Sequence, residues 1–237
     1  MSVIKSVACV VFSLVCSCSP SGGVTTNLTA YQKQVMAYFD AVALGFEFGN
    51  APEVTRKWRE DLRIFVGGNP NEALMLELAE IIAEVNALTT DGFDIGITTD
   101  TLESNGYIFF GSGKDFVKRF APAAPHVDSN FGLFFVNYDG SDYIYESIIY
   151  VDIFRANPDA QKHLLREELT QSLGLARDSP QYDDSIFQRD WTLVTSYAPI
   201  DRDLIRLLYH PAMPAGIEKK GVDEILGKLL PELSIGE

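Results

Sequence analysis

The sequence predicts one α/β domain, in an α+β arrangement, in which a mixed sheet packs against a central helix. Three observations predict this fold class. Segments with helical and with strand-like spacing alternate from residue 29 onward. No shift in composition divides the chain after that point. The chain has 237 residues, 46% of them hydrophobic, which is enough for one large core.

The first half of the chain contains the clearest helix. Residues 29–44 are predicted to form an amphipathic helix, and Leu62 to Val66 a short strand that ends at a Gly-Gly-Asn-Pro turn. Glu72 to Leu88 is predicted to be helical because apolar residues recur every three or four positions. Its glutamates predict a solvated face: Glu72, Glu77, Glu80 and Glu84.

The second half is predicted to begin with strands and to end with helices. The expected strands are Phe93 to Thr98, Tyr107 to Phe110, Gly132 to Tyr138 and Ile144 to Phe154. Asp139-Gly140-Ser141 between the last two is a hairpin signal. A long helix is expected from the N-cap Asn157 to Leu173, with Gly174 ending it. A loop over 176–198 and helices over Ile200 to Tyr209 and Val222 to Leu230 follow.

Charge and cysteine content exclude several function classes. The chain has 19 basic and 33 acidic residues, a net charge of −14, which argues against nonspecific binding to nucleic acid or to anionic lipid. All three cysteines lie within the first 18 residues. A disulfide framework, a cysteine-ligated zinc and a cysteine nucleophile are therefore excluded from the rest of the chain.

The N-terminus is predicted to be a targeting segment. Residues 1–17 combine one positive charge, Lys5, with a short apolar stretch from Val7 to Val15. A transmembrane helix needs about 20 apolar residues, so this stretch is too short to span a bilayer. A charged start, an apolar core and small residues after it are typical of a secretory signal peptide.

The end of this segment resembles a bacterial lipobox. In Val15-Cys16-Ser17-Cys18, the lipidated residue would be Cys18. A cleavage before Cys16, or a plain signal peptide with incidental cysteines, is the alternative. We expect a lipidated Cys18 and flexible tether over 18–28 and a single domain over 29–237. By resemblance to known lipoproteins, the serine after Cys18 favours the outer membrane, facing the periplasm.

The central helix places polar groups among apolar ones. Glu167 and Gln171 lie one turn apart beside apolar positions, and Glu168 points nearby. Burying a carboxylate is costly unless it is paired or binds a cation. These glutamates could instead pair with basic side chains or face solvent, and the basic candidates are Lys162, Arg166 and Arg177.

The segment EELTQSLGLARD resembles the zincin metalloprotease motif His-Glu-x-x-His-x-x-Gly-x-x-His-Asp in its metzincin form. Glu168 matches the catalytic glutamate, Gly174 the glycine at the turn, and Asp178 the acid after the third ligand. The three zinc-binding histidines are replaced, by Glu167, Gln171 and Arg177. Zincins have an antiparallel edge strand just before this helix, and Ile148 to Ile153 is the segment expected there.

A closer resemblance is to a family of uncharacterised bacterial lipoproteins, domain of unknown function 2927. Its pattern matches the helix motif, then Asp178, Ser185-Ile186-Phe187, Asp201 and Leu207-Leu208-Tyr209. Arg177 departs from the pattern, which has asparagine there. The resemblance implies a degenerate zincin-like fold and a lipoprotein, and it implies no activity.

The donor set does not suit zinc. An amide oxygen such as that of Gln171 is a poor zinc ligand, and Arg177 stays protonated and cannot ligate. Glu167 and Gln171 could help to hold a hard ion such as Ca²⁺ or Mg²⁺, with further ligands from the following loop. His163 lies one turn before Glu167 and is the third metal-ligand candidate, although its basic neighbours are more typical of a surface histidine.

Three functions are consistent with this pattern. The first is an envelope lipoprotein that binds a peptide or protein without catalysis, by strand addition at the edge of the sheet. The second is a metal-dependent peptidase in which Glu168 acts as general base. The third is a structural lipoprotein in which Glu167, Gln171 and Arg177 form a buried polar network in place of the metal. Arg177→Ala would then cost on the order of a few kcal/mol of stability.

Overall fold

The computed structural model describes residues 28–47, 50–233 and 235–236. The predicted signal peptide and Cys18 lie outside these residues. The helices are α1 (Ala30–Ala43), α2 (Glu72–Leu88), α3 (Gly113–Arg119), α4 (Pro158–Gln171), α5 (Pro199–Leu208) and α6 (Lys219–Leu229). The strands are β1 (Lys57–Trp58), β2 (Leu62–Gly68), β3 (Ile95–Thr98), β4 (Gly106–Gly111), β5 (Gly132–Tyr138) and β6 (Tyr143–Asp152). A 3₁₀ turn, Ala121–Ala123, follows α3.

The predicted α/β class with a mixed sheet is confirmed. The strand order is β1-β6-β4-β2-β3, all pairs in it are parallel, and β5 pairs with β6 in the antiparallel direction. The hairpin expected at Asp139-Gly140-Ser141 joins β5 to β6. β6 was expected at the edge, but it lies inside the sheet between β4 and β5, so the antiparallel edge strand is β5.

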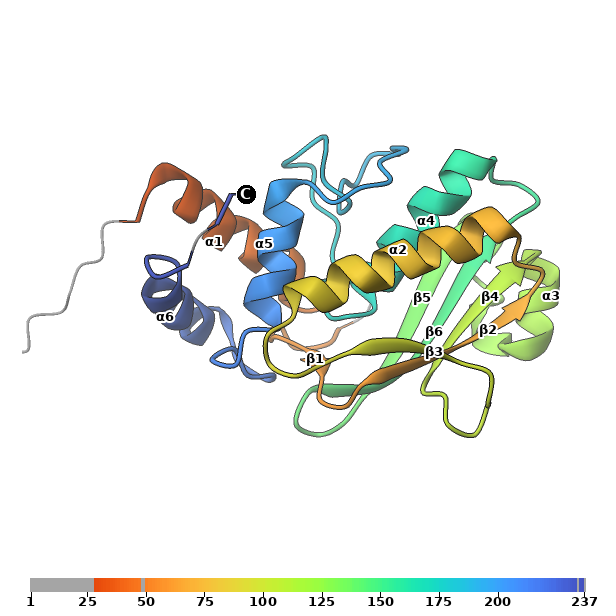
Figure 1. Cartoon of the computed structure of the whole chain (residues 1–237), viewed down its shortest axis with the longest axis horizontal. Coiled ribbons are helices and arrows are strands. Elements are labelled where there is room, and N and C mark those ends of the chain that lie inside the picture. Colours follow the sequence, from red (N-terminus) through yellow and green to blue (C-terminus); the bar gives the residue numbers. More distant parts are fainter. Residues whose placement is uncertain (1–27, 48–49, 234, 237) are drawn as a thin grey trace, which may run out of the picture.

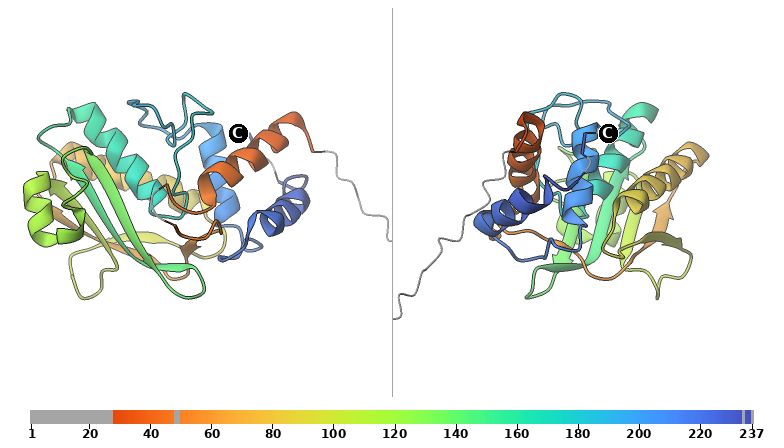
Figure 2. Two further views of the ribbon diagram at one scale, coloured as in Figure 1. Left: turned by 180° about the vertical axis from the view of Figure 1, so that it is seen from behind. Right: turned by 60° about the vertical axis from the view of Figure 1, so that its left-hand side comes forward.

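Helices cover the sheet unequally (Figure 1). α2 and α4 pack side by side on one face, over the main core. On the other face, α3 packs through Phe116 against Phe109 and Tyr150. α1, α5 and α6 gather beyond one end of the sheet, which the two views of Figure 2 show from behind and from the side. The sequence did not predict α3 or β1, because both are short.

α4 is held at both ends. Asn157 caps it as predicted, since its Oδ1 accepts from the backbone N–H of Ala160 at 3.0 Å. At the other end, the indole of Trp58 donates to the carbonyl of Ser172 at 3.0 Å, and the Tyr209 hydroxyl donates to that of Leu173 at 2.9 Å. These bonds use carbonyls that the end of a helix leaves free. The position of α4 relative to the sheet is therefore fixed.

The predicted solvated face of α2 is wrong at Glu77. This carboxylate is buried and accepts from Arg166 on α4, with Nη2 at 2.8 Å and Nε at 3.1 Å. Glu84 accepts from the same guanidinium at 3.1 Å. The contact between α2 and α4 therefore contains a buried ion pair as well as apolar side chains, whereas Glu72 and Glu80 are exposed as expected.

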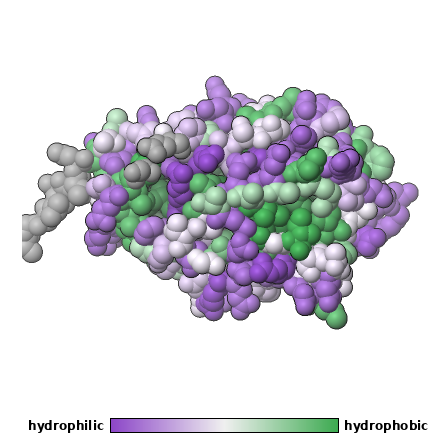
Figure 3. Space-filling model, viewed as in Figure 1, coloured by the Kyte–Doolittle hydropathy of each residue, from purple (hydrophilic) through white to green (hydrophobic). Residues whose placement is uncertain are grey.

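The surface seen in Figure 3 mixes hydrophilic residues with an apolar area near α2 and β3, the elements that carry the exposed Leu76 and Ile97. Among the described residues, no helix has both the length and the apolar character needed to cross a bilayer.

Candidate functional site

A cleft of about 1240 Å³ lies between β5 and α4, and we call it the β5–α4 cleft. β5 contributes one wall and α4 the floor. The loop after α4 and the segment after α1 contribute Phe46, Glu47, Pro52, Ala176, Asp178, Gln188, Arg189, Asp190 and Trp191. The segment before β5 contributes His126, Ser129, Asn130 and Phe131. The predicted site residues Glu167, Glu168, Gln171, Asp178 and His163 all line this one cleft.

Glu168 lies where α4 meets the first residue of β5. Its side chain faces the cleft and is only 7% exposed. A Cβ at Gly132 would stand 2.5 Å from its Oε1, so the carboxyl occupies the space that a side chain at Gly132 would need. Within the described ranges, no residue donates a hydrogen bond to this carboxyl. Burial, followed by the charges of Glu167, Asp178 and Glu47, raises its pKa well above the usual value.

His163 is buried, so the expectation of a surface histidine is wrong. Its Nδ1 donates to the carbonyl of Val194 at 2.7 Å, which leaves Nε2 to face Oε2 of Glu167 at 3.4 Å. The distance fits an ion pair, but burial lowers the pKa of His163 and raises that of Glu167. The contact therefore joins two groups whose charged forms burial disfavours.

Gln171 and Asp178 form the second polar contact in the cleft. The amide Nε2 of Gln171 donates to Oδ1 of Asp178 at 2.6 Å. Burial and the charge of Glu47 raise the pKa of Asp178 to about 6, while the bond from Gln171 and the charge of Arg189 oppose the rise. Asp178 is therefore a carboxyl that titrates close to neutral pH.

Arg177 does not join these groups. Its Nη1 donates to the carbonyl of Leu44 at 3.0 Å and to the exposed Glu53 at 3.2 Å. The predicted contacts of Arg177 with Glu167 and Gln171 are absent from the described structure. The turn at Gly174 and the short stretch after it direct the backbone so that Asp178, and not Arg177, faces the cleft.

The alternative in which Glu167 and Glu168 pair with Lys162 or Arg166 does not hold in the structure. Arg166 points to the opposite side of α4, where its guanidinium forms ion pairs with Glu77 and Glu84. Lys162 lies 3.9 Å from Glu77. Neither glutamate of the motif therefore pairs with a lysine or arginine of its own helix.

The loop after α4 is fixed by the turn at Ser185-Ile186-Phe187. Asp201 accepts from the hydroxyl of Ser185 at 2.6 Å and from the backbone N–H groups of Ile186 and Ala198 at 2.9 and 3.0 Å. Tyr38 bonds the same hydroxyl at 2.7 Å. Burial raises the pKa of Asp201 to about 6 although these bonds oppose the rise. This buried network places the loop, and with it Asp178, at the cleft.

β5 offers an unpaired edge along the cleft. Among the described strands it pairs only with β6. The carbonyl of Phe131 accepts from the N–H of Asp152 at 2.7 Å, and pairing alternates along an antiparallel strand. The backbone groups of Gly132, Phe134 and Val136 therefore point away from β6. They are free to pair with another extended chain.

Sequence reasoning missed the rim of the cleft. Trp191 is 61% exposed and stands edge-on to Phe131 and His163, with ring centroids 6.2 and 6.1 Å away. Glu47 is exposed and also lines the cleft. Isolated aromatic and acidic residues in loops carry no periodic signal, so only the fold brings them to the site.

The donor set does not fit zinc. Gln171 uses its amide nitrogen on Asp178 and Arg177 points away. Two imidazoles line the cleft in the described part of the chain, His126 and His163, and only His163 lies on α4 beside the motif glutamates. No three His, Cys, Asp or Glu side chains within residues 28–47, 50–233 and 235–236 are arranged to hold a metal ion. We therefore derive no catalytic step through zinc.

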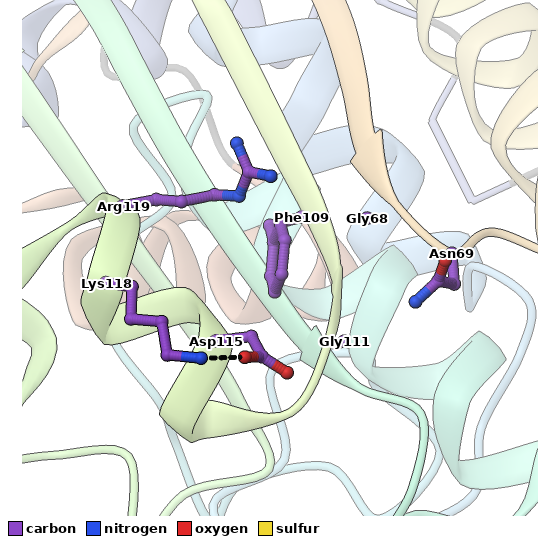
Figure 4. A pocket seen from close by; sticks show the side chains of 7 residues that line it. All are labelled: Gly68, Asn69, Phe109, Gly111, Asp115, Lys118 and Arg119. Atoms are coloured by element: carbon purple, nitrogen blue, oxygen red, sulfur yellow. Dashed lines mark hydrogen bonds and ion pairs between the residues drawn. The ribbon is translucent and has the colours of Figure 1, made fainter.

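A second, smaller cavity of about 440 Å³ lies beside α3 (Figure 4). Its basic groups are Lys118, which pairs with Asp115 at 2.7 Å, and Arg119, whose guanidinium lies 5.6 Å from the ring centre of Phe109. Both belong to a seven-residue helix at the surface. This cavity has none of the buried polar groups that mark the β5–α4 cleft.

A known protein family matches most of this chain. The family model described as Protein of unknown function (DUF2927) matches residues 32–228. The chain belongs to this family. The match includes most of α1 and α6, all of α2 to α5, and every residue that lines the β5–α4 cleft, so the cleft belongs to the DUF2927 domain itself. No curated protein matches the chain.

Proposed function

We propose that this DUF2927 protein is an envelope lipoprotein whose zincin-like domain binds an extended peptide segment without catalysis. One observation carries the proposal. Along one wall the cleft has a strand edge that pairs with no other described strand, and on its floor the buried carboxyl of Glu168 receives no hydrogen bond from the described chain. A peptide in β conformation would pair with Gly132, Phe134 and Val136 and fill the space above α4.

The zincin-like interpretation is supported by an antiparallel edge strand next to the motif helix and by a glycine turn after it. Gly174 has φ +112°, and a Cβ there would lie 1.9 Å from the carbonyl oxygen of Arg56. The replaced histidines argue for binding and against hydrolysis, because neither Gln171 nor Arg177 is a suitable zinc ligand.

The experiment for binding uses two sets of blocked, fluorescent heptapeptides of the same randomised composition. One set has ordinary peptide bonds, and in the other alternate residues are N-methylated and cannot donate to a strand. We expect saturable binding of the first set, measured by fluorescence anisotropy, and loss of binding for the second. Equal binding of both sets would contradict strand addition at β5.

The lipoprotein assignment is tested separately, by mass spectrometry of protein from bacterial membranes. We expect acyl chains on Cys18 and a mature chain whose net charge is 18 − 33 = −15. Cys18→Ser would release the protein from the membrane fraction and Cys16→Ser would not. Unmodified Cys18 would contradict the anchor.

Hydrolysis is the second candidate function, and the environment of Glu168 favours it. A buried carboxyl with a raised pKa and no hydrogen-bond partner within the described chain could hold or accept a proton near neutral pH. Cleavage of a quenched fluorescent peptide library, with metal analysis of untagged protein, separates the candidates. Turnover that Glu168→Gln abolishes, together with stoichiometric metal, would replace the binding proposal.

A further inference from the structure

The charge of the cleft is unbalanced. Glu167, Glu168 and Asp178 lie along its floor and wall, and Glu47 stands at the rim. Each of the three inner carboxyls experiences the charge of its acidic neighbours, which raises their pKa values beyond the effect of burial. These groups form one electrostatic unit and attract a cation together.

Basic side chains of the protein do not neutralise this unit. Arg189 is the single Lys or Arg among the described residues that line the cleft, and it acts on Asp178 only through its field. The nearby cations bind elsewhere, Arg166 and Lys162 at Glu77 and Arg177 at Glu53. The cleft therefore gathers acidic groups that no cation of the described fold pairs, and a cationic ligand would favour their ionised forms.

The unpartnered Glu168 is the independent sign of a ligand. Its carboxyl is more than nine-tenths buried, faces the cleft, and receives no hydrogen bond from the described chain. Buried polar groups in native proteins almost always have partners. A ligand with N–H donors would supply the missing ones.

Aromatic side chains provide a path for an alkyl stem. Trp191 is exposed beside Phe131, and both rings stand next to the cleft above His163. Long basic side chains bury their methylenes against such rings while the charged end reaches a carboxylate. The rings and the carboxyls together fit a lysine or arginine side chain better than a bare metal ion, because Gln171 directs its amide N–H groups, not its oxygen, to Asp178.

We propose that the β5–α4 cleft selects extended peptides that insert a lysine or arginine side chain between β5 and α4, where Glu167, Glu168 and Asp178 bind its cationic end. This specificity rests on the proposed peptide-binding function. The side chains on the α4-facing side of β5 alternate with those on the other face, so one peptide residue in two would face the carboxyls.

The experiment uses four pools of blocked, fluorescent heptapeptides with the central residue fixed and the other six randomised. The central residue is Lys, Arg, norleucine or Glu. We expect the Lys and Arg pools to bind about tenfold or more tighter than the norleucine pool, and the Glu pool to bind weakest. Norleucine keeps the alkyl stem of lysine and removes only its charge.

Two variants with the same change of charge locate the effect. Glu168→Gln in the cleft should reduce the preference for Lys over norleucine to about twofold or less. Glu80→Gln on the exposed face of α2 should leave the preference unchanged. Circular dichroism confirms that both variants are folded, so loss of preference is not loss of structure.

The possible results distinguish failure of the cationic specificity from failure of peptide binding itself. Equal affinity for the Lys and norleucine pools would overturn the cationic specificity and leave peptide binding in place. No binding of any pool at roughly 1 mM would overturn the proposed function itself. Calorimetric titration with CaCl₂ alone, if it showed saturable binding that Glu168→Gln removes and that displaces the Lys pool, would replace the basic side chain with a divalent cation.

Discussion

Gly132 and Glu168 share one small space between β5 and α4. A Cβ at Gly132 would lie 2.5 Å from Oε1 of Glu168 and 2.8 Å from Cδ2 of Leu164, closer than Cβ atoms approach other non-bonded heavy atoms in proteins. The strand can pass this near the helix only because residue 132 has no side chain. The carboxyl of Glu168 is thereby buried at the start of an unpaired strand edge.

Gly132→Ala is therefore expected to move the Glu168 carboxyl while the fold persists. The contacted atoms are the ends of two side chains that can rotate, so the loss of stability should be about 1–3 kcal/mol. The affinity for peptide should fall by more than the loss of stability explains. The displaced Glu168 carboxyl would either block the peptide or no longer reach it. Anisotropy with the Lys pool and urea unfolding measure the two effects, and unchanged affinity would contradict a role for this contact.

The raised pKa of Asp178 predicts that the folded protein loses stability as pH rises. Its pKa is raised from 3.8 to about 6 in the folded protein, so folding favours the protonated carboxyl. The stability that this proton contributes is complete below pH 3.8 and is lost as pH rises through about 6. Glu167 and Glu168 have pKa shifts in the same direction.

Asp178→Asn removes this ionisation. We expect the variant to be more stable than the wild type at pH 8 by on the order of 1 kcal/mol, which is about 2–4 °C in Tm, and equal to it near pH 4. The exposed Asp128→Asn is the control, with no such pH-dependent gain. A variant that is less stable than the wild type at pH 8 would show that the bond from Gln171 outweighs the charge.

Hydrophobic periodicity and helix capping predicted most of the helices and strands. The features that the sequence did not predict depend on contacts between segments that are distant in the chain. α2 has the bounds that its apolar spacing indicated, and Asn157 caps α4 as expected. α4 ends at Gln171, two residues before the expected Leu173, and Gly174 turns the chain after it. The burial of Glu77 depends on Arg166, 89 positions away, which no local pattern reveals. Likewise the direction of Arg177 depends on Leu44, and the edge position of β5 on the pairing of β6 with β4.

The turn at Gly174 gives a sharper prediction. Its φ of +112° is strained for residues with a side chain, and a Cβ there would lie 1.9 Å from the carbonyl oxygen of Arg56, a backbone atom that cannot rotate away. Gly174→Ala should cost about 3 kcal/mol or more in urea unfolding. At Gly140 a Cβ has no heavy atom within 4 Å, so Gly140→Ala should be nearly neutral. Equal stabilities of the two variants would mean that the chain turns differently after α4.

Arg166 and Arg177 are predicted to differ strongly although they lie close in sequence. Arg166 is 1% exposed and pairs with Glu77, which is 4% exposed, so Arg166→Ala would leave a buried carboxylate without its partner. Removal of one member of a buried pair typically costs about 3–5 kcal/mol. Arg177 is 36% exposed and its partner Glu53 is 75% exposed, so Arg177→Ala should cost less than about 1 kcal/mol.

Urea unfolding of both arginine variants and of the Glu77→Ala/Arg166→Ala double variant measures this difference. We expect the double variant to be more stable than the sum of the two single losses predicts, because it removes the unpaired buried charge. A loss of several kcal/mol in Arg177→Ala would favour the structural network of Glu167, Gln171 and Arg177 that the sequence suggested. It would also imply that the side chain of Arg177 faces the β5–α4 cleft and not Leu44.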